Sequence, residues 1–245
     1  VMKNVAGYDL PKLMTGALGT LGVITRAVFR LHPLPESSRT LSFAFVDSKA
    51  ANDFILAVAD SQVVPTGLQM RTGADGSINV DIRIDGIAAG IAAQVESVCK
   101  LAGKASASEP EGDPWQAREQ LWSSAGSACI FKLSVLPTQL ASTVEFVRGS
   151  LGGSSAWRLL MYSHGLAWLC AEAGEGMRVI EFLAKLRAFL SRTGGSAVLL
   201  QAPAELRQKV DVWGEAGSAL ALMTRIKQQF DPRGILNRAR FVGGI

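Results

Sequence analysis

Three glycines at three-residue spacing, near the start of the chain, form the pattern that points most directly to ligand chemistry. They are Gly16, Gly19 and Gly22. Asp9 and Pro11 predict a short helix over residues 11–18, because Asp caps helix N-termini and Pro fits the first turn. The β-branched run over residues 23–31 predicts a strand after the glycines. Since glycine has no Cβ, such a turn lets the backbone approach a flat or phosphorylated ligand.

The same spacing also occurs where a helix and a strand simply pack closely. It differs from the dinucleotide fingerprint G-x-G-x-x-G, which follows a strand and opens a helix, whereas here the helix is expected first. The glycines alone therefore leave two interpretations open, a ligand-binding loop and an ordinary tight turn.

Cysteine and histidine offer little material for metal or acid–base chemistry. Cys99, Cys129 and Cys170 are far apart and form no C-x-x-C pair, which disfavours an iron–sulfur cluster or a structural zinc held by this chain alone. They are typical of buried free thiols in a reducing compartment. His32 and His164 are the two histidines, and His164 is expected in an exposed turn. We therefore expect no metal site and assign no catalytic residue.

Three arginines lie on expected strands, namely Arg71, Arg83 and Arg158. A guanidinium binds a carboxylate through two parallel hydrogen bonds, so each is a candidate for contacting a substrate acid. The alternative is a position on the solvent face of a sheet, which the alternation of Asp81 and Arg83 favours.

The composition indicates a globular protein with a sizeable core. The chain has 245 residues, of which 48% are hydrophobic and 19% charged, and its net charge is +4. The basic residues are dispersed, which argues against a nucleic-acid partner. The longest nearly uncharged stretch, residues 154–171, contains Arg158 and His164, so two buried strands explain it better than a membrane span. The start of the chain lacks the apolar region of a signal peptide, so we expect a cytoplasmic protein without a transmembrane segment.

The middle of the chain predicts a β-α-β-β-α order that occurs twice. Period-2 strands and period-3.6 helices alternate from residue 41 to residue 200, with a polar connection at residues 103–114. We expect the α+β class, with one mostly antiparallel sheet and helices on one face, over residues 38–202.

Motifs at the two ends carry a resemblance to a known family. AGYDLPKLMTGALGTLGVIT resembles the signature that closes the FAD-binding domain of the vanillyl-alcohol oxidase/p-cresol methylhydroxylase superfamily of FAD-linked oxidases. LMTRIKQQFDPRGILNRARF resembles the family's ending, F-D-P-x-G-I-L-N-P-G-R. The phrases LRQKVDVWG, FKLSVLP and WRLLMYSHGLAWLCAEAG are most similar to the smaller FAD-binding subunit of bacterial glycolate oxidase.

The resemblance implies a division of the chain and a set of cofactor contacts. Residues 1–37 would close a PCMH-type FAD-binding domain, 38–202 would form a ferredoxin-like duplicated cap domain, and 203–245 would return to the FAD-binding domain. The implied FAD-contacting residues are Gly16, Gly19, Thr20, Leu21, Gly22, Val23, Ile24 and Asn237. A side chain at Gly19 or Gly22 is expected either to enter the space where the backbone approaches the flavin or to force a conformation reserved for glycine. Arg238-Ala239 departs from the family's Pro-Gly, which changes the backbone freedom of the tail.

The resemblance also implies a function. The chain would be the C-terminal portion of an FAD-binding subunit in a glycolate oxidase-type 2-hydroxy-acid oxidoreductase complex, with a catalytic flavin subunit and an iron–sulfur subunit as partners. The family's pyrophosphate-binding glycine loop is missing, so FAD would not be retained by these residues alone. No histidine lies in a matching motif, which favours a role in electron transfer or assembly, in the cytoplasm or at the inner membrane through partner subunits. The alternative is a non-enzymatic α+β module that binds a protein partner or a small carboxylate.

The two ends of the chain are expected to pack on each other. Residues 1–35 and 217–245 resemble parts of one domain, and neither has a complete core alone. A helix ending at Phe230 carries an apolar face that includes Met223 and Ile226, and its expected neighbour is the strand over residues 23–31.

Overall fold

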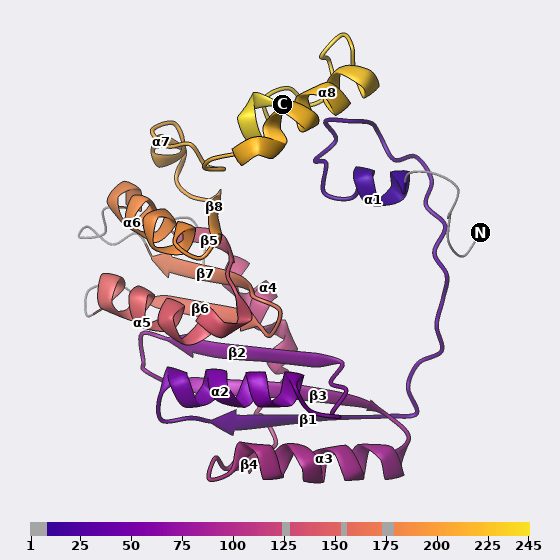
Figure 1. Cartoon of the computed structure of the whole chain (residues 1–245), viewed down its shortest axis with the longest axis vertical. Coiled ribbons are helices and arrows are strands. Elements are labelled where there is room, and N and C mark those ends of the chain that lie inside the picture. Colours follow the sequence, from indigo (N-terminus) through magenta and orange to yellow (C-terminus); the bar gives the residue numbers. More distant parts are fainter. Residues whose placement is uncertain (1–8, 124–127, 153–155, 173–178) are drawn as a thin grey trace. The chain divides into compact units, whose positions relative to one another are not determined.

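The computed structural model describes residues 9–123, 128–152, 156–172 and 179–245 (Figure 1). The chain divides into two compact units. The larger unit is Pro33–Val212, and the smaller unit combines Val1–His32 with Trp213–Ile245. The assignment of these units to a cap domain and a flavin domain stays a prediction.

One antiparallel sheet organises the larger unit, in the strand order β4-β1-β3-β2-β6-β7-β5-β8 (Figure 1). Its strands are β1 (Ser37–Ala44), β2 (Gly67–Gly73), β3 (Ile78–Gly86), β4 (Ala107–Ser108), β5 (Ala128–Ser134), β6 (Trp157–Tyr162), β7 (Leu166–Glu172) and β8 (Ser196–Gln201). The predicted antiparallel sheet is confirmed, and the central pairing of β2 with β6 joins its two halves.

Four helices cover one face of this sheet (Figure 1). They are α2 (Ser48–Ala59), α3 (Ala88–Ala102), α5 (Leu140–Leu151) and α6 (Val179–Ser191). In α2, residues spaced three and four apart face the sheet and are buried, including Ala51, Ile55 and Val58. The order β1-α2-β2-β3-α3 recurs as β5-α5-β6-β7-α6, as the sequence predicts.

The opposite face of the sheet is also partly covered, which differs from the expectation of helices on one face alone. After β4 come a 3-10 turn, η1 (Pro114–Gln116), and the short helix α4 (Ala117–Trp122). Leu121 of α4 is buried in a second apolar cluster with Ile130, Leu160 and Trp168. The connection between the halves therefore protects apolar side chains that alternate away from the four helices.

Helix α5 receives its N-terminal cap from the other half of the sheet. Gln139 at its N-cap position makes no side-chain cap hydrogen bond. Instead, buried Asn52 of α2 accepts a hydrogen bond from the Ala141 amide at 3.1 Å and donates one to the Pro137 carbonyl at 2.9 Å. Asn52 thus satisfies polar groups that a helix terminus leaves unpaired.

The smaller unit contains short helices joined by turns. Its helices are α1 (Leu10–Met14), α8 (Leu220–Phe230) and the 3-10 turns η3 (Gly217–Ala219) and η4 (Val242–Gly244). The Asp9 carboxylate accepts from the Lys12 amide at 3.1 Å, so the predicted cap is confirmed. The helix ends at Met14, earlier than expected, because Thr15 is already extended, with ψ 119°.

The predicted strand over residues 23–31 is wrong. These residues form no strand, and their apolar side chains are exposed; Val28 is 91% and Leu31 88% exposed. β-branched residues favour a strand only when a neighbouring strand supplies hydrogen bonds and packing. In the part of the chain that the structure describes, no segment pairs with them. None of the described helices is long and apolar enough to cross a membrane.

Candidate functional site

The glycine loop that follows α1 has a left-handed backbone at three positions. Gly16, Leu18 and Gly19 have φ values of +81°, +52° and +75°. A Cβ at Gly16 would meet nothing within 4 Å, and one at Gly19 would meet only the Asn237 side chain, 3.8 Å away. The loop therefore combines a glycine-type conformation with open space beside its backbone.

The C-terminal segment holds this loop by two hydrogen bonds to backbone carbonyls. The Asn237 amide nitrogen, Nδ2, donates to the Leu18 carbonyl, and Lys227 Nζ donates to the Thr20 carbonyl at 2.7 Å. These carbonyls lie on either side of Gly19. The Thr20 side chain is buried and its hydroxyl donates to the Ala17 carbonyl at 2.8 Å. The structure thus brings together three of the predicted site residues, from opposite ends of the sequence.

Lys227 and Asp231 belong to this arrangement, although the sequence analysis missed them. Lys227 Nζ lies 2.7 Å from Asp231 Oδ2, and the two side chains are 12% and 4% exposed. The Asp231 carboxylate also accepts from the amides of Ile235 and Leu236, at 3.0 and 2.8 Å. Hydrogen bonding to Lys227 is the main cause that lowers the pKa of Asp231 to about 2. The signal in the sequence is a Lys–Asp pair at i, i+4 at a helix end, which usually indicates a surface pair.

The other predicted FAD-contacting residues differ in how exposed they are. Leu21 and Gly22 are half-buried, whereas Val23 and Ile24 are 78% and 66% exposed. The expected glycine-only conformation is found at Gly19 but not at Gly22, whose φ is not positive. A Cβ at Gly22 would meet the Met14 sulfur at 3.8 Å, an ordinary contact distance.

At Arg238-Ala239, where the family pattern has Pro-Gly, the backbone adopts a strained conformation. Ala239 has φ +58° and Asn237 has φ +37°. Ala239 therefore adopts the left-handed conformation that a glycine at this position would adopt without steric cost. Arg238 donates through Nε to the Gly234 carbonyl, which closes the turn.

An apolar cavity of about 170 Å³ lies in the smaller unit beside the glycine loop. Its wall includes Ala17 and Leu21 from the loop and Met223 and Ile226 from α8. The expected contact between the two ends of the chain is therefore present. The neighbour of α8, however, is the glycine loop and not the strand predicted over residues 23–31.

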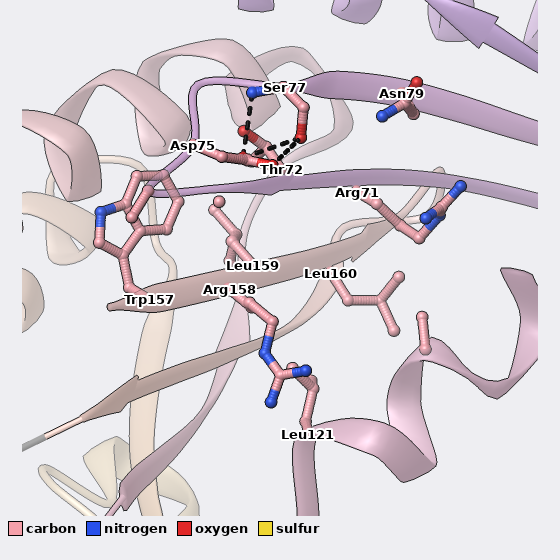
Figure 2. Close-up of a pocket in the computed structure, with 13 residues that line it drawn as sticks. Arg71, Thr72, Asp75, Ser77, Asn79, Leu121, Trp157, Arg158, Leu159 and Leu160 are labelled. Carbon is pink, nitrogen blue, oxygen red and sulfur yellow. Dashed lines mark hydrogen bonds between the residues drawn. The ribbon is translucent and has the colours of Figure 1, made fainter. Parts of the chain in front are cut away.

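A second candidate site lies in the larger unit beside α4 (Figure 2). This pocket has a volume of about 340 Å³, and Figure 2 shows the Arg158 side chain extending toward Leu121. At its other side, the Ser77 hydroxyl donates to the Asp75 carboxylate at 2.9 Å. The hydroxyl of Thr72, which also lines the pocket, is buried and has no hydrogen-bond partner among the described residues.

The first of the three candidate arginines is bound within the protein. Arg71 makes a bidentate contact with the fully buried Asp81 carboxylate, with Nε–Oδ2 2.6 Å and Nη2–Oδ1 2.9 Å. Asp81 accepts further hydrogen bonds from Ser42 at 2.8 Å and Gln69 at 3.0 Å. This contact with Asp81 raises the pKa of Arg71. Arg71 is therefore neither a solvent-face residue nor free to bind a carboxylate.

The remaining polar candidates also have partners. Arg83 Nε contacts Asp85 Oδ1 at 3.0 Å, and Arg158 Nη2 donates to the Gln120 carbonyl at 3.3 Å. His164 is exposed in the turn between β6 and β7, as expected, and its ring stacks on Tyr162 with 5.7 Å between centroids.

The chain is similar to several known proteins. Residues 212–240 match the family described as FAD linked oxidases, C-terminal domain. Over 98% of its length the chain is 26% identical to glycolate oxidase subunit GlcE of Escherichia coli (strain K12), and it spans 59% of that protein. A segment covering 27% of the chain is 37% identical to glycolate oxidase subunit GlcD of Bacillus subtilis (strain 168), of which it covers 14%. Among solved structures, an alkyldihydroxyacetonephosphate synthase matches 96% of the chain and 50% of its own, with a TM-score of 0.64 at 16% identity; this likeness shows the fold alone.

The fold and these similarities support a relation to PCMH-type FAD-linked oxidases, whose C-terminal domain matches residues 212–240. The similarity to GlcE extends along nearly the whole chain.

Members of this family bind FAD, and the residues present fit part of such a site. The hydrogen bonds of the described residues leave the amides of Gly19, Leu21 and Gly22 without an acceptor. A side chain at Gly16 or Gly19 would occupy space that is open in this structure. Free amides beside open space are what a cofactor needs for close backbone contact.

Proposed function

We propose that this chain is the C-terminal portion of the FAD-binding subunit of a glycolate oxidase-type 2-hydroxy-acid oxidoreductase complex. The observation that supports this most is the junction at Gly19, where Lys227 and Asn237 hold the carbonyls on either side. Two family motifs thereby form one site, although more than 200 residues separate them in the sequence. The similarity to GlcE over 98% of the chain supports the same proposal.

In this proposal the smaller unit supplies backbone to the flavin. FAD, when bound, supplies the electron chemistry, and the protein supplies binding and orientation. The loop from Gly16 to Ile24 lines the cofactor with its backbone, and Gly19 leaves room for close approach. Asn237 fixes the loop from the opposite side. The larger unit is the cap domain.

The exposed apolar segment over residues 22–34 belongs to the same proposal. Six large apolar side chains in it are exposed by 66% or more: Val23, Ile24, Val28, Phe29, Leu31 and Leu34. Contiguous exposed apolar surface is typical of an interface. We infer that this segment pairs with the remainder of an FAD-binding domain, and that these residues alone do not retain FAD or act as an enzyme.

The proposed partners are a catalytic flavin subunit and an iron–sulfur subunit. Neither histidine lies in a motif that matches the family, and His164 is an exposed turn residue. The role of this subunit is therefore electron transfer or assembly, in the cytoplasm or at the inner membrane through its partners.

A visible absorption spectrum tests the cofactor proposal. The 245-residue chain is expected to be colourless as purified, and the full-length protein is expected to show a flavin band. Gly19→Val in the full-length protein should abolish that band, because the side chain enters the open space and φ +75° disfavours a branched residue. Gly76→Val is a matched control, because Gly76 has φ +77° in a turn of the larger unit. Full flavin occupancy in Gly19→Val would contradict the proposal.

The pocket beside α4 favours a second candidate, a non-enzymatic module that binds a small carboxylate. Its wall presents Arg158 and the unpartnered Thr72 hydroxyl to a space of about 340 Å³. Titration calorimetry of the flavin-free chain with glycolate separates the two. Saturable binding that Arg158→Met weakens supports the module, and absence of heat with normal flavin loading of the full-length protein supports the oxidase subunit.

A further inference from the structure

Lys227 uses its whole hydrogen-bonding capacity inside the smaller unit. Its side chain is 12% exposed, and its ammonium group has three acceptors: the Thr20 carbonyl at 2.7 Å, Asp231 Oδ2 at 2.7 Å and the Leu236 carbonyl at 2.8 Å. A lysine has three N–H donors, so none is left for solvent or ligand. Asp231 neutralises its charge, which makes the low exposure of Lys227 tolerable.

These three contacts join separate parts of the unit. The Thr20 carbonyl belongs to the glycine loop, whereas Asp231 and the Leu236 carbonyl belong to the turn that follows α8. The Asp231 carboxylate also accepts hydrogen bonds from the amides of Ile235 and Leu236, which fixes the turn that immediately precedes Asn237. Lys227 therefore links the glycine loop to the turn that precedes Asn237 and fixes their relative position.

Planarity of the peptide bond converts this contact into an orientation of the loop amides. In a trans peptide the carbonyl of one residue and the amide of the next point in opposite directions. A Thr20 carbonyl directed at Lys227 therefore turns the Leu21 N–H away from α8. By the same rule, the Leu18 carbonyl directed at Asn237 turns the Gly19 N–H away from the C-terminal turn. These two amides are among those that no described group accepts.

We propose that Lys227 is a positioning residue for the flavin site: by holding the Thr20 carbonyl, it orients the Leu21 amide as a donor to the cofactor, in parallel with Asn237 and the Gly19 amide. This inference rests on the proposed function. Lys227 itself touches no cofactor, since all its donors are committed within the protein.

The test compares full-length Lys227→Met with Lys185→Met, a control on α6 whose lysine is 63% exposed and pairs only with Glu181. Lys227→Met should raise the FAD dissociation constant tenfold or more, because a charge-assisted contact that orients the loop is lost. Residual bound flavin should change its visible circular dichroism, and hydrogen exchange should accelerate in the flavin-free protein at the Thr20 amide, which donates to the Ala17 carbonyl within the loop. Lys185→Met should leave all three measurements unchanged.

Lys227→Arg sharpens the result, because arginine keeps the charge but its planar fork does not match three acceptors around one nitrogen. It should fold and still lose FAD affinity. If Lys227→Met fails to fold, Lys227→Gln, which keeps two N–H donors, takes its place in the comparison. Unchanged affinity, dichroism and Thr20 exchange in the folded variants would overturn the inference while the parent protein still binds FAD. A parent full-length protein that binds no FAD would instead overturn the proposed function.

Discussion

The two compact units are stabilised by different kinds of contact. In the larger unit, apolar side chains pack on both faces of one sheet, around residues such as Phe43, Ile82 and Phe131. In the smaller unit, α8 buries no residue fully, and hydrogen bonds to carbonyls and the Lys227–Asp231 pair supplement its partly exposed apolar face beside the glycine loop. A packed core tolerates small displacements, whereas directed polar contacts depend on geometry. The smaller unit should therefore respond to changes that the larger unit ignores.

The largest expected effect is in the larger unit, at the fully buried Asp81 carboxylate that pairs with Arg71. Asp81→Ala removes the acceptor of Arg71 and Ser42, leaves Gln69 with the Pro114 carbonyl, and should lower the free energy of unfolding by about 3–5 kcal/mol. Urea unfolding followed by far-ultraviolet circular dichroism measures it. Asp85→Ala on the same strand is the control; its partner Arg83 is 41% exposed, so the loss should stay below about 1 kcal/mol. Equal losses would show that burial of Asp81 does not matter.

A smaller effect, of opposite sign, is expected in the smaller unit. Ala239→Gly relieves a left-handed alanine at φ +58° and should stabilise this unit by about 1 kcal/mol. Hydrogen exchange of the α8 amides measures the change without contribution from the sheet. Ala221→Gly, the same substitution at an exposed helical position, should destabilise α8 by about 1 kcal/mol. Two shifts of the same sign would show that the conformation of residue 239 carries no strain.

A third effect appears only in acid. Hydrogen bonding to Lys227 lowers the pKa of Asp231 to about 2, below the usual value of about 3.9. A lowered pKa in the folded state contributes stability that is complete above about pH 4 and is lost as the pH falls toward 2. Exchange of the α8 amides should therefore accelerate across this window, and Asp231→Asn should remove the dependence. A profile identical in the variant would assign the acid sensitivity to other carboxylates.

Local sequence pattern predicted the elements of the larger unit because its strands and helices are amphipathic. The strand predicted from Ile78, Val80, Ile82 and Ile84 is found as β3, and the turn at Asp75-Gly76 precedes it. The same pattern favoured positions on the solvent face for Asp81 and Arg71, and this prediction was wrong. The second face of the sheet is covered by the connection between the halves, where the Pro114 carbonyl accepts from Gln69 at 2.8 Å, and such long-range cover leaves no local signal.

The candidate site was predictable in part. Gly19 and Asn237 follow from the family motifs, and the structure places Asn237 on the carbonyl before Gly19. Lys227 could not be predicted, because its importance comes from the Thr20 carbonyl, which no spacing rule connects to it. The failed strand over residues 23–31 has the same origin: β propensity predicts a strand only where another segment completes it.

The N-terminal cap that α2 supplies to α5 has a consequence for how the duplicated sheet folds. The first turn of α5 is complete only when Asn52, from α2, lies against it. Helix α5 should therefore consolidate late, after the two halves have met, and mutations at Asn52 should speed unfolding more than they slow folding. A domain with two topologically equivalent halves then unfolds as one cooperative unit, and neither half is an autonomous folding module.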